Sequence, residues 1–176
     1  MRHLREAILA GHATNVVFFA AACNGGALRR IAYPASQAEV ICINAADGYG
    51  NPASFNPDAS DDNENLSALG VDVHSAWLGN DYVRKSGTSF ATPLAAGIAA
   101  SVMDFVLRSA EGYTDHDKAV AERIKTRPGI VSVFKKHVAF SRENGGGFRF
   151  IAPHRLFNEY SKGEVDKVLL NTLREA

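Results

Sequence analysis

Apolar residues follow two different periods in the first part of the chain. Near the N-terminus, Leu4, Ala7 and Ile8 recur at steps of three and four, which predicts a helix. Residues 15–22 (NVVFFAAA) and 39–45 (EVICINA) are apolar on nearly every position and rich in β-branched and aromatic residues. Continuous apolar runs of this length are typical of strands covered on both faces of a parallel sheet.

The middle of the chain predicts a loop, a strand and a long helix. Residues 47–70 are rich in Asn, Asp, Ser, Gly and Pro, which predicts a long surface connection and not a packed element. A third short strand is expected at 71–76. From Thr88 to about Ala110 a helical period returns, and the many small residues suit close packing against a sheet. The residues that carry this period are Leu94, Ala95, Ile98, Ala99, Val102, Met103 and Val106.

Beyond residue 110 the pattern is weaker. It predicts helices around 117–126 and 130–137 and a turn at 145–147 before a short strand. Residues 159–175 predict a terminal helix or tail. The chain has no internal repeat and no interior linker, so a single domain is expected.

Composition and charge narrow the class of protein. Of 176 residues, 46% are hydrophobic and 22% are charged, with 19 basic and 19 acidic side chains, as in an ordinary soluble globular protein. This balance suggests neither a nucleic-acid partner nor a membrane partner. Cys23 and Cys42 lie in apolar runs, which favours free, reduced thiols over a disulfide or a metal site.

Two apolar segments raise the question of targeting. The N-terminus has no uninterrupted apolar stretch ending in a cleavage site, so it is a poor secretory signal, and a cytoplasmic location is the default expectation. Residues 86–103 carry no charge and reach the ~18 residues at which a membrane span is considered. They also contain Ser, Thr, Gly and Pro93, so a buried core helix is the better interpretation.

The long helix begins in an unusual sequence, SGTSFATP, at residues 86–93. One serine would suffice to cap a helix, whereas this stretch crowds four hydroxyl residues around Gly87. Pro93 is tolerated only near a first turn, which places the helix start close to Ser89. A hydroxyl there lies at the positive end of the helix dipole, and its backbone N–H points at any oxygen under attack. This geometry suits the nucleophile of an acyl transfer.

Acyl transfer also needs a second donor for the developing oxyanion. AAACNGG at residues 20–26 ends a predicted strand with Asn24, which would emerge at the carboxyl edge of the sheet. Asn-Gly-Gly after a strand is by itself usually only a turn. The combination with Ser89 favours a role for Asn24 as an oxyanion donor.

These segments together resemble a known family. GTSFATP resembles the serine motif G-T-S-x-A-x-P of the subtilisin-like serine endopeptidases, the subtilases. AAACNGG resembles the family's A-A-G-N-x-G strand end, and EVICINAADGYGNPASFN and LGVDVHSAWLGNDY resemble the strand and the segment that follow. The order agrees over about residues 4–110. The resemblance implies an α/β fold, a mostly parallel sheet flanked by helices, present as a partial domain in residues 1–155, with 156–176 as a terminal helix or tail.

The resemblance also implies roles for single residues. Ser89 matches the nucleophile, Asn24 the oxyanion side chain with the Ser89 N–H as its partner, and Thr88 a positioning residue. Ala22, Cys23, Gly87 and Thr88 are expected to contact a polypeptide substrate. Departures from the family pattern are Cys23, where glycine is usual, Phe90, where methionine is common, and Leu94, where histidine is common. The first of these departures would crowd the pocket.

The family's catalytic aspartate and histidine precede the serine, and neither motif is present in this chain. His12 is expected at the wrong end of the sheet, and His74 is expected to be structural. The remaining histidines, His3, His116, His137 and His154, are expected at the surface. Asp72 shares a face with His74, but an ion pair or a solvated loop is a better interpretation than a relocated dyad.

The acidic residues Asp58, Asp61, Asp62 and Glu64 do not match a calcium-loop spacing, so a solvated loop is expected and a structural calcium is unsupported; no cofactor is expected.

Three hypotheses stay open: a truncated product of an endopeptidase whose N-terminal half lies in cis, a pseudoenzyme or protein-binding module, and a chain that takes Asp and His from a partner in trans. The first is favoured. Without the acid and the base, the chain alone is expected to be nearly inert.

Overall fold

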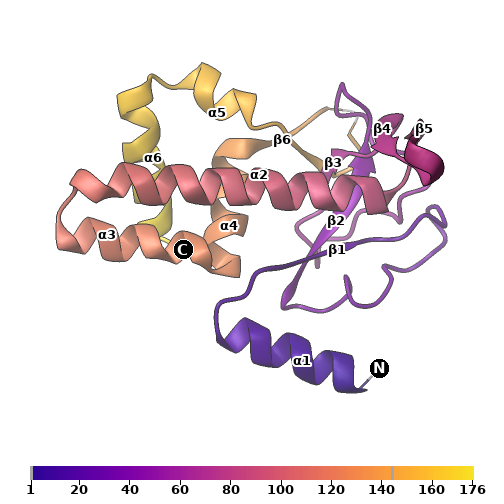
Figure 1. The fold of residues 1–176 in the computed structure, drawn as a ribbon, viewed down its shortest axis with the longest axis horizontal. Helices are drawn as coiled ribbons and strands as arrows, with labels where there is room; N and C mark the ends of the chain where they lie inside the picture. Colours follow the sequence, from indigo (N-terminus) through magenta and orange to yellow (C-terminus); the bar gives the residue numbers. More distant parts are fainter. Residues whose placement is uncertain (1, 144) are drawn as a thin grey trace.

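The computed structural model describes residues 2–143 and 145–176 of the chain (Figure 1). A five-stranded sheet lies at one end of the molecule, and the helix α2 runs from this sheet along the whole length to a group of C-terminal helices. The sheet is mostly parallel, and helices flank it, as the fold class inferred from the sequence requires.

The strands in the sheet follow the order β1–β2–β3–β7–β6. The first four are parallel, with Phe18 opposite Val40 and Ile43 opposite Leu66, and only β6 runs antiparallel to its neighbour. The bounds are β1 Phe18–Ala21, β2 Val40–Ala46, β3 Leu66–Leu69, β6 Ala139–Ser141 and β7 Arg149–Ile151. A separate antiparallel hairpin consists of β4 Val73–Ala76 and β5 Tyr82–Lys85, joined through the 3₁₀ turn Leu78–Asn80.

The helices divide into two groups. α1 Arg2–Ala13 precedes the sheet, and α2 Thr88–Ser109 crosses it. The C-terminal group contains α3 Asp115–Ala121, α4 Arg127–Val133, α5 His154–Glu159 and α6 Lys162–Arg174, with the shorter helical turns Ala110–Gly112, Glu122–Lys125 and Phe134–Val138 between them.

The buried centre of the molecule lies between β2 and α2. β2 is buried at every position because it has a strand on each side and side chains packed on both faces. Ile41 and Ile43 belong to the main core with α2, whereas Cys42 packs in a smaller cluster with Ala22 and Ala35. Burial, with a smaller contribution from the Glu64 charge, raises the pKa of the Cys42 thiol to about 12.

The helix α2 packs closely on the sheet because its inward residues are small. Ala91, Ala95 and Ala99 are buried against it. At the end of β3, a Cβ on Gly70 would stand 2.8 Å from the Ala45 Cβ and 2.9 Å from the Ala91 Cβ. The absence of a side chain at this position therefore lets the first turn of α2 approach the sheet directly.

Several expected elements are confirmed, one of them, the strand expected at 71–76, with a partner outside the main sheet, and one expectation is wrong. The helix before β1, the strand at 39–45, the long helix from Thr88 and the terminal helix all form. Residues 73–76 do not join the sheet, because they pair with β5 in the hairpin. The third strand of the sheet is Leu66–Leu69, inside the segment expected to be an unpacked loop. Its four residues are too few to stand out beside the polar stretch that precedes them.

Burial also differs from expectation in three places. β1 is only half-buried because it is an outer strand of the sheet, and on the helix before it Leu4 is 49% exposed whereas Ile8 is buried. His137, expected at the surface, is half-buried, with Nε2 2.7 Å from the Thr172 hydroxyl. The C-terminal helix α6 contributes Val165, Leu169 and Leu173 to the same core as the sheet. A boundary at residue 155 remains a sequence-based prediction.

The helix α2 is long and apolar enough, by length and composition, to cross a membrane, and it is the one such helix in the described residues. Only 28% of its most apolar stretch is buried. Pro93 and Leu94 line one apolar groove beside this helix, and Ala96 and Met103 line another. The inward face of α2 packs along β1, β2 and β3.

Candidate active site

The first turn of α2 and the loop after β1 meet at the carboxyl edge of the sheet. The helix begins at Thr88, with Gly87 as its N-cap, and no side chain caps it from within the motif. Asn24 instead reaches it from the loop after β1: its Oδ1 accepts hydrogen bonds from the Thr88 N–H at 2.8 Å and from the Thr88 hydroxyl at 3.1 Å. These contacts connect residues separated by 64 positions in the chain.

The glycine before the helix makes this contact possible. A Cβ on Gly87 would stand 3.3 Å from Nδ2 of Asn24, tighter than most real contacts of this kind. The Gly87 N–H also donates to the Gly70 carbonyl at 2.8 Å, which ties the helix entry to the end of β3. Asn24 and Gly70 therefore fix the N-terminus of α2 from two sides.

Two N–H groups at this junction remain unused within the described residues. Nδ2 of Asn24 makes no hydrogen bond there, since only its Oδ1 is engaged. The backbone N–H of Ser89 is in the first turn of the helix, and within residues 2–143 and 145–176 it also donates to nothing. The side chain of Ser89 is exposed.

The sequence-predicted residues Ala22 and Cys23 lead into the site. Ala22 is fully buried, and its backbone pairs with the Ile43 and Ala32 backbones at 3.0 and 2.7 Å. Cys23 is half-buried and carries a free thiol, directly before Asn24. The backbone on which Asn24 stands is therefore held in the core rather than in a free loop.

The Ser89 hydroxyl has no hydrogen-bond partner among the residues that the structure describes. His12 lies in the last turn of α1, before the amino end of β1, and so at the end of that strand opposite to Asn24. His74 stacks on the Tyr82 ring at 5.2 Å. The position of His12 agrees with its expected place at the other end of the sheet, and the role of His74 stays a prediction.

Asp72 forms the ion pair that was the favoured interpretation. Its Oδ2 accepts from Nη1 of Arg84 at 2.8 Å, with both side chains 64% exposed. The Asp72 N–H donates to Oγ of Ser86 at 2.9 Å, so the first serine of the motif holds the hairpin base and not the helix.

Sequence reasoning did not find the polar contacts that hold the neighbouring loop. Oδ1 of Asn56 accepts from the Ala45 N–H at 2.9 Å, and its Nδ2 donates to the Ala45 carbonyl at 2.7 Å. Burial raises the pKa of Asp47, but hydrogen bonds from the Asn51 side chain and from the backbone of Asn51 and Tyr49 outweigh it and lower the pKa overall. An Asn or Asp in a loop gives no signal for such pairing until the partner backbone is placed.

The acidic residues of the same loop do not form a metal site. In the described part of the chain no group of three or more His, Cys, Asp or Glu side chains is arranged to hold a metal ion. Glu64 instead pairs with Arg127 at 2.6 Å, and both side chains are 18% exposed.

Comparison with known proteins decides the family. The model of the subtilase family matches residues 2–127, more than half of the chain. The chain belongs to the subtilase family. Subtilisin DY of Bacillus licheniformis is 36% identical over 103 residues, which cover 57% of this chain and 37% of that protein. A thermostable alkaline protease of Halalkalibacterium halodurans is 38% identical over 99 residues, 56% of this chain and 27% of that protein.

This subtilase therefore spans about a third of the length of these relatives. Among solved structures, the self-cleaved protease domain of PatA is 33% identical with a TM-score of 0.56, over 68% of this chain and 44% of that one. The PatG macrocyclase domain has a TM-score of 0.67 at 19% identity, over 97% of this chain and 48% of that one, which shows the fold alone. These two relatives are named as a subtilisin and an alkaline protease.

Proposed function

We propose that this chain carries the nucleophile and the oxyanion-binding half of a serine endopeptidase domain. In this proposal Ser89 attacks the carbonyl carbon of a peptide bond, the C–N bond breaks, and the amine leaves with the proton that the base took from the Ser89 hydroxyl. Water then hydrolyses the acyl-enzyme that remains on Ser89. Nδ2 of Asn24 and the Ser89 backbone N–H donate to the oxygen that becomes negative. Cys23 lies at the surface that the polypeptide substrate contacts, whereas Ala22, Gly87 and Thr88 are buried and support this surface from beneath.

The observation that carries the proposal is the pair of hydrogen bonds from Thr88 to Oδ1 of Asn24. A carboxamide held by its oxygen has a fixed orientation, so its nitrogen is presented in one direction before any substrate binds. Preorganised donors stabilise a transition state more than donors that must turn during the reaction. Thr88 is therefore a positioning residue and acts through Asn24.

The proton of the Ser89 hydroxyl needs an acceptor, which we propose is a histidine oriented by an aspartate. We place both in a part of the catalytic domain outside residues 1–176, which is joined to this chain in cis or, as the less simple case, supplied in trans. Two features support this. The sheet ends at β1, whose residues are only half-buried. Beside α2, Leu94 and Phe157 are 39% and 49% exposed on an apolar groove of about 390 Å³. Both leave apolar surface and strand edge for further chain.

The chain alone is then expected to be nearly inert. In subtilisin, loss of the oxyanion asparagine lowers the rate by about 10²–10³, and loss of the base lowers it by about 10⁶. The second of these losses applies to the isolated chain. The alternative function is a catalytically inactive subtilase-like pseudoenzyme or protein-binding module. Among the described residues no side chain is hydrogen-bonded to the Ser89 hydroxyl, which favours this alternative.

A chimera separates the two functions. The matching segment of Subtilisin DY is replaced by this chain, so that the relative supplies the acid and the base. We expect casein hydrolysis, its loss in Ser89→Ala and a fall of about 10²–10³ in Asn24→Leu. Ser141→Ala, at the exposed end of β6, is the control and is expected to leave the rate unchanged. A folded chimera that is inert, with Ser89 unreactive to a fluorophosphonate, would favour the pseudoenzyme. Labelling of Ser89 in the isolated chain would show that the missing base is not needed.

A further inference from the structure

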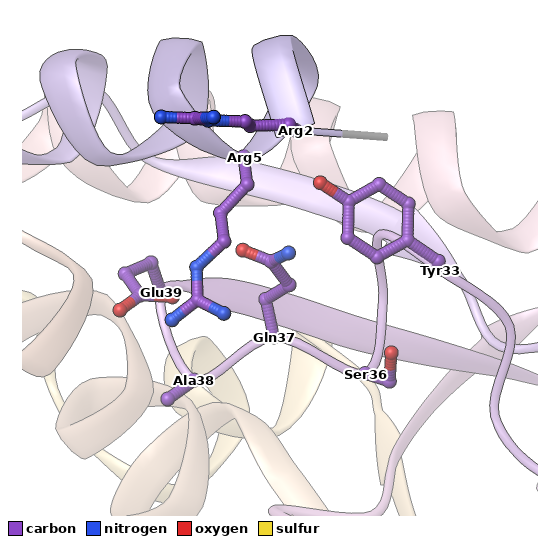
Figure 2. Close-up of a pocket in the computed structure, with 7 residues that line it drawn as sticks. All are labelled: Arg2, Arg5, Tyr33, Ser36, Gln37, Ala38 and Glu39. Carbon is purple, nitrogen blue, oxygen red and sulfur yellow. The ribbon is translucent and has the colours of Figure 1, made fainter.

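A second pocket lies between the first turns of α1 and the loop 33–39 that precedes β2 (Figure 2). It encloses about 510 Å³ and shares no residue with the Asn24–Ser89 site. Arg2 and Arg5 approach it from the helix, and Tyr33, Gln37 and Glu39 approach it from the loop. Nothing in the proposed proteolytic function uses this pocket.

Two polar atoms on its wall are buried and unpaired. The Tyr33 hydroxyl and Oε1 of Gln37 have no hydrogen-bond partner in the described residues. Leaving such an atom unpaired costs about 1–3 kcal/mol, and most buried polar atoms in folded proteins do have partners. Figure 2 shows the Tyr33 hydroxyl and the Gln37 carboxamide pointing up from the loop toward α1. The pocket thus presents one donor and one acceptor to an occupant.

The charges around these two atoms are mixed. Arg5 extends from α1 down toward the loop, and its guanidinium ends between Glu39 and Gln37 (Figure 2). Arg5 forms no ion pair within the described residues, whereas Arg2 is bonded to Glu6 along the helix at 3.1 Å. Arg5 is therefore the cation available to an anionic group. The Glu39 carboxylate beside it disfavours a dianion and suits a ligand that also carries an N–H donor.

We propose that this pocket binds the C-terminal end of a peptide. The terminal carboxylate pairs with Arg5 and accepts from the Tyr33 hydroxyl, and the last amide N–H donates to Oε1 of Gln37. A terminal carboxylate with an amide N–H on the same residue carries the acceptor and the donor that the wall lacks. The volume accommodates two or three residues, and the binding does not depend on Ser89.

The test is an NMR titration of the ¹⁵N-labelled 176-residue chain, whose folding is first checked by circular dichroism. The probes are N-acetyldiglycine, its C-terminal amide, and inorganic phosphate. We expect N-acetyldiglycine to shift the amide signals of residues 2–5 and 33–39 in a saturable way. The neutral amide and phosphate are expected to bind at least about tenfold more weakly, because the amide lacks the charge, whereas phosphate lacks the amide N–H and is partly a dianion, which Glu39 disfavours.

Variants assign the contacts. Arg5→Gln and Tyr33→Phe are each expected to weaken N-acetyldiglycine binding about tenfold or more. Tyr33→Phe removes an unpaired hydroxyl, so it is expected to fold as well as the parent. Arg30→Gln, the same charge change at an exposed loop arginine outside the pocket, is the control and is expected to bind normally. Equal binding of the neutral amide, tighter binding of phosphate, shifts elsewhere in the molecule, or unchanged affinity in both variants would each overturn the proposal.

Discussion

Gly70 tests how the site is held, because it allows α2 to approach the sheet. In Gly70→Ala the new Cβ would meet Cβ of Ala45 at 2.8 Å, Cβ of Ala91 at 2.9 Å and the Gly87 carbonyl oxygen at 3.0 Å. These three atoms belong to β2, to α2 and to the helix N-cap, and none is the flexible end of a side chain. The first turn of α2 must therefore move away from the sheet.

The size of the effect follows from two opposing contributions. Overpacking a rigid site costs about 1–3 kcal/mol, and three simultaneous contacts place this site near the upper end. Replacing glycine by alanine also restricts the unfolded chain, which returns about 0.4–1 kcal/mol. The expected net loss of unfolding free energy is about 2 kcal/mol, which corresponds to a fall in Tm of about 4–8 °C for a chain of this size.

Gly97→Ala is the matched control on the same helix. A Cβ at Gly97 would have nothing within 4 Å, so the change only improves helix propensity, by about 0.8–1 kcal/mol. Urea denaturation followed by circular dichroism gives both free energies, provided that the m-values agree. The two variants are expected to differ by about 3 kcal/mol. A Gly70→Ala variant as stable as the parent would refute the idea that close contact at this glycine holds the start of α2.

Three further predictions concern the rest of the fold. Burial and, to a smaller extent, the Lys136 charge lower the pKa of His137, and the Glu159 charge opposes them only in part. The neutral imidazole therefore contributes stability that is complete above the unfolded pKa of about 6.5 and is lost as pH falls below it. Urea midpoints measured between about pH 7.5 and 5 should accordingly fall less in His137→Gln than in the parent. Glu64→Gln should lower the unfolding free energy by about 1–3 kcal/mol in the same assay, because the half-buried Arg127 guanidinium loses its partner. The double variant Glu64→Gln/Arg127→Met should recover part of this loss, and losses that simply add would contradict the reasoning. Arg123→Ala should cost about 1 kcal/mol, because Nη1 donates at 3.1 Å to the last carbonyls of α6, and unchanged amide exchange in that helix would argue against it.

The long helix and the buried strands were predictable from the sequence because their signal is local and repeated. α2 carries the same period along its 22 residues, and β2 is apolar at nearly every position. Leu66–Leu69 was missed because a four-residue strand gives no period of its own, and its place is set by β2 and β7 on either side. Residues 73–76 look like a sheet strand in isolation, but their pairing with β5 depends on the turn that follows.

The candidate site was predictable to the level of residue type but not of contact. The serine motif and the Asn-Gly-Gly strand end indicated Ser89 and Asn24, and the structure brings their segments together. Nothing in the residue pattern indicated that Thr88 would hold the asparagine by its oxygen, or that Gly70 would receive the helix entry. Both contacts join positions far apart in the chain, so no local pattern encodes them.

The arrangement separates two requirements of acyl transfer within one fold. Orientation of the proposed oxyanion donors needs only β1, the end of β3 and the first turn of α2, and these are tied together by Asn24, Thr88 and Gly70. Transfer of the Ser89 proton needs a base, and this requirement is independent of those contacts. On the proposed function, restoring the base to the chain would restore turnover without any rearrangement of the donors. Asn24→Leu would therefore lower the rate of the chimera and also weaken the start of α2 by about 1–3 kcal/mol, because Thr88 is 1% exposed and its N–H and hydroxyl would lose their shared acceptor.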